Sequence, residues 1–350
     1  MSSKTSPPDW QADYTALIQA GTAASTRRAY ARDGRYFWAW AHAAVNLSEH
    51  YPVAVETVIR FVLDHVNGPA PDTDHALIAT GHKQRPGPLK ISTLDRYLAS
   101  LAVAHQARGV ESPTRDPAVR LLLRRARAAR AHEPPRKKAA ITRAILERLL
   151  ATCDDTLAGM RDRALLLVGF AAGGRRRSEL AALAVRDLRR IDDGFILMVR
   201  RSKTDQAGRG LEVPVLGRAA VALSAWLVQS GIREGKLFRG IRAQGALYAG
   251  LSGKSIGCIV KRRVKLAGLD PDRFGVHSLR AGFITEAARH GAPLGDAMSL
   301  SGHRCVHIAS GYYREAALLK NPAADLLSDR VAPRAGDAGT PTAATDDGSH

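Results

Sequence analysis

The sequence predicts a mainly α-helical protein with one small antiparallel β-hairpin, divided into two domains. Apolar residues recur at helical spacing along most of the chain, and only residues 195–199 and 211–215 form short β-rich runs. The 350 residues are enough for two separate hydrophobic cores. Pro134 and Pro135 interrupt the helical pattern inside a basic segment, so we expect the domains to meet there.

The first domain is predicted to consist of four short helices without a strand. The first begins at Ser25 and places Tyr30, Phe37, Trp40 and Ala41 on one side. The second covers residues 55–66, and a Gly/Pro-rich connector that includes residues 82–86 follows it. The third helix is expected to begin at Ser92 or Thr93, and the fourth with Asp116 as its cap and Pro117 in its first turn.

The second domain is predicted to combine helices with the hairpin. Thr142 is a candidate cap for its first helix, and residues 160–170 are apolar enough to form a helix covered on all sides. After the hairpin, helices are expected at residues 218–229 and 254–266. In the first of these we expect Val221, Ala225 and Val228 to face inward.

The charge of the chain favours a polyanionic partner. Lys and Arg number 52 against 33 Asp and Glu, a formal net charge of +19, and nucleic acid is the commonest polyanion. No apolar run reaches the roughly 18 residues of a membrane span, and the first residues lack the apolar core of a signal peptide. The three cysteines have no CxxC spacing. We therefore expect a cytoplasmic protein with reduced thiols and no membrane segment.

Basic residues are concentrated in two parts of the first half. Residues 115–143 contain ten basic and two acidic side chains, which suits a linker that crosses a DNA backbone, although a plain charged spacer has the same composition. Arg27 and Arg28 occupy the polar side of the first helix, where a solvated basic face is the alternative.

Residues 275–314 contain side chains that suit a phosphodiester. His277 and Arg280 are three residues apart, so on a helix both reach one bound group. Arginine can hold two phosphate oxygens, histidine can move a proton near neutral pH, and the Tyr312 hydroxyl can act as a nucleophile. Upstream, two glycines precede three consecutive arginines at residues 175–177. The glycines permit a tight turn close to a ligand, and a purely structural role would not explain three arginines at the start of a helix.

These motifs resemble the tyrosine recombinases of the phage integrase family. The resemblance covers residues 142–314 and depends on the order of dispersed motifs: Arg176 to Leu180, Lys203 in the hairpin tip, His277-Ser278-Leu279-Arg280, Ser301-Gly302-His303, and Tyr312 nine residues later. The first half resembles the family's helical core-binding domain more weakly. Arg175 stands where the family usually has an aliphatic residue, and Ser301 replaces the common leucine.

The resemblance implies a fold, a set of domains and a catalytic set. It implies a helical core-binding domain followed by an α+β catalytic domain. With the composition of the chain, this predicts a disordered lead-in at 1–20, the core-binding domain at 21–133, a basic linker at 134–140, the catalytic domain at 141–330 and a disordered tail at 331–350. The implied catalytic residues are Arg176, Lys203, His277, Arg280, His303 and the nucleophile Tyr312. The expected DNA contacts are Arg27, Arg28, Arg136, Lys137, Lys138 and Arg201. Arg175 and Arg177 are alternatives for the first arginine, and Tyr313 is an alternative nucleophile.

The implied activity is site-specific recombination of double-stranded DNA by a homotetramer. The strand is cut and rejoined through a 3′-phosphotyrosyl intermediate, so neither a metal nor ATP is expected to take part. A type IB topoisomerase and a non-catalytic DNA-binding regulator are the alternatives. The first would relax supercoils without a specific site, and the second would form no covalent adduct.

Overall fold

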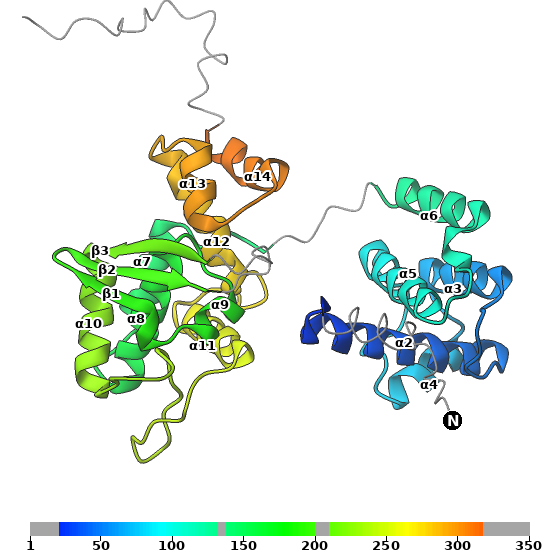
Figure 1. Ribbon diagram of the computed structural model, residues 1–350, viewed down its shortest axis with the longest axis horizontal. Coiled ribbons are helices and arrows are strands. Elements are labelled where there is room, and N and C mark those ends of the chain that lie inside the picture. The colour runs from blue at the N-terminus through cyan, green and yellow to red at the C-terminus, as the bar shows by residue number, and fades with distance from the viewer. Residues whose placement is uncertain (1–20, 132–137, 201–209, 318–350) are drawn as a thin grey trace, which may run out of the picture. The chain divides into compact units, whose positions relative to one another are not determined.

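The computed structural model describes residues 21–131, 138–200 and 210–317. The chain divides into two compact units, Met1–Pro135 and Arg136–His350, and each has its own hydrophobic core (Figure 1). Among the described residues, no helix is long and apolar enough to span a membrane. The predicted lead-in, tail and most of the linker lie outside the described residues, so the domain boundaries stay predictions.

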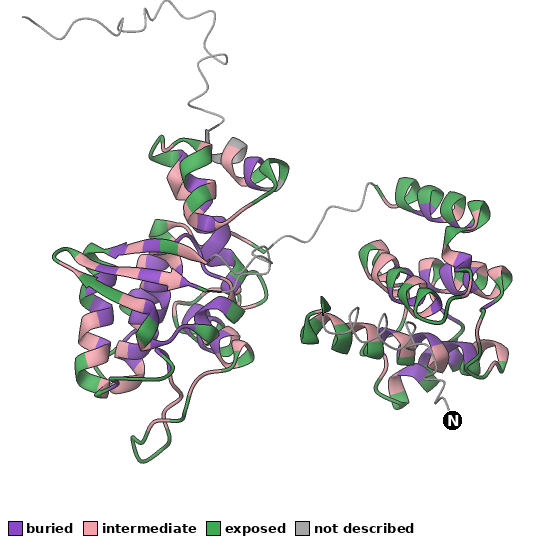
Figure 2. Cartoon of the chain, viewed as in Figure 1, coloured by how far each residue is buried: buried purple, intermediate pink, exposed green. Residues whose placement is uncertain are grey.

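The first unit is helical throughout its described part. Its elements are α2 (Ala24–Val45), α3 (Val55–Asn67), α4 (Pro71–Ala79), α5 (Ile91–Gln106), the 3-10 turn η1 (Pro113–Arg115) and α6 (Pro117–Ala129). The core is aromatic at its centre, where Phe37, Trp40 and Phe61 are buried and their rings contact one another. Figure 2 shows the buried positions along the inner sides of these helices. The unit therefore has the all-helical architecture that the sequence predicts.

The connector after α3 contains a helix that the sequence analysis missed. Pro71 was expected to belong to a Gly/Pro-rich loop, but it occupies the first turn of α4, where its missing N–H costs nothing. Asp74 of this helix is buried, pairs with Lys83 and accepts a hydrogen bond from the backbone N–H of Gly87 at 2.6 Å. This ion pair holds the following turn against α4.

The second unit contains eight described helices, a 3-10 turn and one sheet. The helices are α7 (Arg143–Ala151), α8 (Leu157–Ala171), α9 (Arg177–Ala182), α10 (Gly217–Ser230), α11 (Gly253–Leu266), α12 (Val276–Arg289), α13 (Leu294–Ser301) and α14 (Val306–Ala317), and the 3-10 turn is η2 (Val185–Asp187). Strands β1 (Leu188–Ile191), β2 (Gly194–Val199) and β3 (Leu211–Leu216) form an antiparallel sheet in the order β1-β2-β3. The expected hairpin is β2–β3, with Leu197 opposite Val213. Strand β1 was not predicted, because the two exposed arginines Arg189 and Arg190 interrupt the alternation of apolar and polar residues that is typical of a strand.

Helix α8 forms the centre of the second core, as predicted for the apolar stretch at 160–170. It contacts α10, α12 and β3, and Leu165 and Leu166 are fully buried. The prediction for α10 was wrong in orientation. Val221 and Val228 are 70% and 81% exposed, whereas Leu223 and Trp226 are fully buried.

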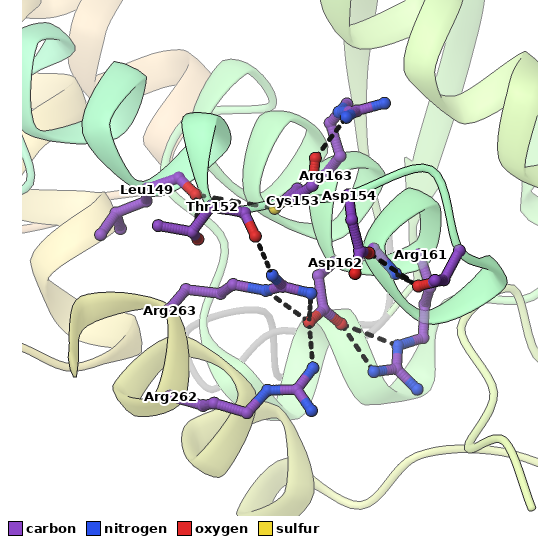
Figure 3. Close-up of polar contacts among 11 residues, drawn as sticks. Leu149, Thr152, Cys153, Asp154, Arg161, Asp162, Arg163, Arg262 and Arg263 are labelled. Atoms are coloured by element: carbon purple, nitrogen blue, oxygen red, sulfur yellow. Dashed lines mark hydrogen bonds and ion pairs between the residues drawn. The ribbon is translucent and has the colours of Figure 1, made fainter. Parts of the chain in front are cut away.

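A buried carboxylate joins α8 to α11. Asp162 is fully buried and accepts hydrogen bonds from Arg161 on its own helix and from Arg262 and Arg263 on α11, at 2.6–2.9 Å (Figure 3). Arg263 also donates to the carbonyl oxygen of Thr152. Since a buried charge without partners is strongly unfavourable, these arginines fix the position of α8 relative to α11.

Candidate active site

The turn between α8 and α9 carries the first predicted arginine. Gly173 and Gly174 have φ of +87° and +68°, a conformation that favours glycine, and they reverse the chain after α8. Arg176 follows as the N-cap of α9. Glu179 is buried, accepts from the Arg176 backbone N–H at 3.0 Å and binds its Nη1 at 2.6 Å. Glu179 therefore holds Arg176 by both its backbone and its guanidinium, and 24% of the Arg176 side chain stays exposed.

Arg280 extends from α12 to the same turn. A Cβ added at Gly174 would lie 2.2 Å from the Cα of Arg280, so the two segments are in direct contact. Arg280 Nη1 donates to the carbonyl oxygen of Ser301 at the end of α13. Its Nη2 is buried and has no hydrogen-bond partner within the described residues. Burial and the positive charges of Arg176 and Arg175 lower the pKa of Arg280 to about 10. Such a concentration of positive charge favours an anion.

His303 completes a hydrogen-bonded chain around Arg280. Its Nε2 lies 3.1 Å from Arg280 Nε, which can only donate, so Nε2 must be the acceptor. Its Nδ1 lies 2.7 Å from Ser301 Oγ and must then carry the proton of the neutral ring. Burial, followed by the charges of Arg280 and Arg176, lowers the pKa of His303 to about 4. The ring is therefore neutral at pH 7.

His277 lies one helical turn before Arg280 on α12. Partial burial lowers its pKa, and the charges of Arg280 and Arg176 lower it further. Its charge also contributes to the lowered pKa of His303. The structure thus brings together Arg176, His277, Arg280 and His303, which come from three segments far apart in the sequence.

The two neighbouring tyrosines of α14 have different environments. The Tyr313 hydroxyl donates to the carbonyl oxygen of Ala292 at 2.6 Å, between α12 and α13. The half-buried Tyr312 makes no hydrogen bond through its hydroxyl within the described part of the chain. Helix α14 contacts α12, which carries His277 and Arg280, and α13, after which His303 follows. Of the two phenols, Tyr312 is the one whose hydroxyl is not already bound to the backbone.

Comparison with known proteins identifies the family of the chain. Residues 140–318 match the phage integrase family, and over 326 residues the chain is 30% identical to the integrase/recombinase xerD homolog of Selenomonas ruminantium. That alignment covers 89% of this chain and 88% of the relative. The chain belongs to the phage integrase family.

A second relative and a solved structure extend the comparison of this phage integrase family member. It is 25% identical to the recombinase cre of Escherichia phage P1, over 65% of this chain and 71% of that protein. Its fold resembles that of the Tn1549 transposon integrase solved in complex with transposon right end DNA, with a TM-score of 0.58 and 16% identity. That alignment covers 90% of this chain and 98% of the solved chain. The mainly helical fold class with a small antiparallel sheet is therefore confirmed, and so is the family resemblance.

Several predicted residues of this integrase-family chain are not part of the described cluster. Lys203 and Arg201 lie outside the described residues, as do Arg136 and Lys137. Arg200, the last described residue before Arg201 and Lys203, pairs with Asp187. Asp187 also accepts a hydrogen bond from the backbone N–H of Ala184 at 3.0 Å. The roles of these residues stay predictions.

The remaining expected DNA contacts lie at exposed positions. Arg27 and Arg28 are exposed near the start of α2. Lys138 is exposed and donates to the carbonyl oxygen of Asp272, so in this structure it holds the segment before α12. Nothing in these contacts assigns a DNA strand to them.

Two site features were missed by the sequence analysis. Arg175 was considered as an alternative to Arg176, but it is 1% exposed and donates to the carbonyl oxygen of Leu300, whereas 24% of the Arg176 side chain is exposed. Ser301 was noted only as a departure from leucine, yet its hydroxyl binds His303. Within the described ranges, no cluster of three or more His, Cys, Asp or Glu side chains is placed to hold a metal ion.

Proposed function

We propose that this chain is a site-specific DNA recombinase that cuts and rejoins double-stranded DNA through a 3′-phosphotyrosyl intermediate. The observation that carries the proposal is the convergence of Arg176, His277, Arg280 and His303. Among them lies a buried N–H of Arg280 that has no partner within the described residues. A phosphate is the anion that suits two guanidinium groups and two imidazoles. Family membership and relatives named recombinases support the same conclusion.

In the proposed cleavage step, the Tyr312 oxygen attacks the scissile phosphorus. A bond forms between this oxygen and phosphorus, and the bond from phosphorus to the 5′ oxygen breaks. A free tyrosine has a pKa of about 10, so the attack needs a base or nearby positive charge. His277 would accept the phenolic proton, and Lys203 would give a proton to the departing 5′ oxygen.

Arg176 and Arg280 would bind the non-bridging oxygens of the phosphate. Each donor aimed at the charge that develops in the transition state can contribute about 3 kcal/mol. Both are held in advance by contacts that can persist when the phosphate binds, Arg176 by Glu179 and Arg280 by Ser301. Little reorganisation would therefore be needed when the phosphate arrives.

His303 would donate a hydrogen bond to the phosphate after DNA binds. In the structure its Nε2 accepts from Arg280, and the surrounding positive charges hold the ring neutral. A bound phosphate brings negative charge that opposes this effect and favours a second proton on the ring. His303 would then change from acceptor to donor.

The covalent ester would keep the energy of the broken bond for rejoining, so the reaction would need no ATP. Exchange of strands between two duplexes would require a homotetramer on two paired sites. The exposed basic residues Arg27 and Arg28, together with Arg136, Lys137, Lys138 and Arg201, would contact the DNA backbone. We infer that the protein acts in the cytoplasm, where cellular DNA is accessible.

Trapping of the covalent intermediate tests this function. The protein is incubated with nicked duplexes taken from the DNA that flanks its own coding region, and products are separated on denaturing gels. We expect a retarded protein–DNA band that Tyr312→Phe abolishes and Tyr313→Phe retains, because the Tyr313 hydroxyl is bound to Ala292.

Each other outcome has a definite meaning. Loss of the band in Tyr313→Phe alone would reassign the nucleophile. Relaxation of any supercoiled plasmid without a specific site would favour a type IB topoisomerase. Specific DNA binding with no adduct from the unmodified chain would favour a regulator that has no strand-transfer activity.

A further inference from the structure

Arg175 is a buried arginine beside the cluster, and the proposed cleavage step does not use it. Its side chain is 1% exposed, and burial lowers its pKa. Glu179, at 3.8 Å from Nη1, is its nearest carboxylate, and Glu179 binds Arg176 more closely at 2.6 Å. Its buried Nε has no partner within the described residues. Because burying such a group is unfavourable, its position requires an explanation beyond stability.

The guanidinium of Arg175 connects two parts of the cluster that are 125 residues apart. Its Nη2 donates to the carbonyl oxygen of Leu300, in the last turn of α13, and lies 3.5 Å from the carbonyl oxygen of Gly173. The last carbonyls of a helix have no partner within the helix and carry its partial negative charge, so a cation is favourable there. Arg175 therefore holds the end of α13 against the turn that carries Arg176.

Gly173 makes this contact possible. A Cβ at Gly173 would lie 2.2 Å from the Leu300 oxygen and 2.7 Å from Arg175 Nη2. Any larger residue at position 173 would therefore displace the Arg175–Leu300 contact.

The segment that Arg175 holds leads directly to the chemistry. Arg175 binds the Leu300 carbonyl, and Arg280 binds the next carbonyl, that of Ser301. Gly302 then ends α13 in the left-handed conformation, and His303 follows with its backbone N–H bonded to Met298 at 3.2 Å. The two arginines thus fix consecutive peptide groups immediately before His303 and α14.

We propose that Arg175 is a positioning residue that sets the distance between the Arg176 turn and the His303–Tyr312 segment. The expected effect of Arg175 on the rate of adduct formation rests on the proposed recombinase function. Its expected effect on the structure of the DNA-free protein does not. Without the Arg175–Leu300 bond, Arg280 would be the remaining arginine that binds the last carbonyls of α13. The histidine and tyrosine would then occupy a wider range of positions relative to Arg176 and Arg280.

The test compares Arg175→Met, Arg175→Lys and the control Arg218→Met with the unmodified chain. Methionine keeps the apolar stem without the donors, and lysine keeps the charge with a single ammonium donor. Arg218 is an exposed arginine of α10 that pairs with Glu147. The first measurement is the single-turnover rate of adduct formation as a function of DNA concentration.

We expect Arg175→Met to lower the maximal rate about 100-fold, since displacement of a catalytic group by roughly 1 Å has an effect of this size. The DNA concentration at half-maximal rate should stay the same, Arg175→Lys should recover part of the rate, and Arg218→Met should react normally. A rate equal to that of the unmodified chain in Arg175→Met would overturn the proposal. A loss in rate matched by weaker DNA binding would overturn it as well.

Amide hydrogen exchange on the DNA-free protein separates this inference from the proposed function. In Arg175→Met the amides of Gly302 and His303 should exchange at least about tenfold faster, while those of α8 keep their protection. Faster exchange across the whole second unit would indicate a general loss of stability and would overturn the positioning role, as would unchanged exchange at His303. If no DNA gives an adduct with the unmodified chain, the proposed function fails, and this measurement still decides whether Arg175 holds the segment.

Discussion

Substitution of Gly174 by alanine should separate the two arginines that the proposed mechanism needs. Gly174 has φ of +68°, where alanine is disfavoured by about 1 kcal/mol. In addition, the new Cβ would lie 2.2 Å from the Arg280 Cα, whereas ordinary contact begins near 3.4 Å. The backbones of the turn and of α12 must therefore move apart by roughly 1 Å, a displacement that can lower a catalysed rate about 100-fold.

Gly231 provides a matched control for this substitution. It has φ of +64° at the end of α10, and a Cβ there would meet nothing within 4 Å. Gly231→Ala should therefore cost the same backbone strain without any change in the rate of adduct formation. Thermal unfolding checks the stability of both variants, and trapping on nicked DNA checks the rate. An adduct rate in Gly174→Ala equal to that of Gly231→Ala would refute the idea that close contact at Gly174 sets the spacing of the arginines.

Two further predictions concern stability. His65 is fully buried, its Nδ1 lies 2.7 Å from the Phe61 carbonyl oxygen and its Nε2 lies 2.8 Å from the Tyr36 hydroxyl, and burial lowers its pKa to about 4. Between pH 6.5 and 4 the unfolded state therefore binds more protons than the folded state. The contribution of His65 to stability is complete above this window and decreases as the pH falls through it. Between pH 7 and 5 the free energy of unfolding of the first unit, measured in urea, should decrease by about 2 kcal/mol. A His65→Gln variant with the same pH slope would contradict this assignment. Asp162→Asn should lower the unfolding free energy of the second unit by about 3 kcal/mol, because it leaves three arginines without their buried carboxylate. The control is Asp155→Asn, which changes a carboxylate that is 94% exposed. Equal midpoints of unfolding for the two variants would show that the Asp162 cluster contributes little to the stability of the second unit.

The sequence predicted those elements whose pattern is strong and local. In α11 the apolar residues Ile256, Ile259, Val260 and Val264 are all buried, because they form one stripe at helical spacing. Helix α10 was assigned the wrong inner face, since its many alanines weaken the periodicity and leave the two valines as misleading markers. The missed helix α4 shows a related limit: a proline at the first turn of a helix and a proline in a loop look alike in the sequence.

Some residues of the candidate site could be predicted from the sequence and others could not. Four of the predicted side chains that the structure brings together, Arg176, His277, Arg280 and His303, could be chosen from the sequence by their types and their order along the chain. The supporting contacts could not. That Arg175 reaches Leu300, or that Ser301 faces His303, depends on how α13 packs against the turn before α9, and no local pattern contains that information. The position of Lys203 lies outside the described residues and stays a prediction.

The bond between Tyr313 and Ala292 limits how α14 can move. Successive side chains on a helix point about 100° apart, so the anchored Tyr313 side chain opposes any turning of α14 about its own axis. A swing of α14 would keep the anchor only if the loop around Ala292 travelled with it. In the proposed mechanism, Tyr312 should therefore approach the phosphate without rotation of α14 about its own axis, so that the direction of the phenol is preserved.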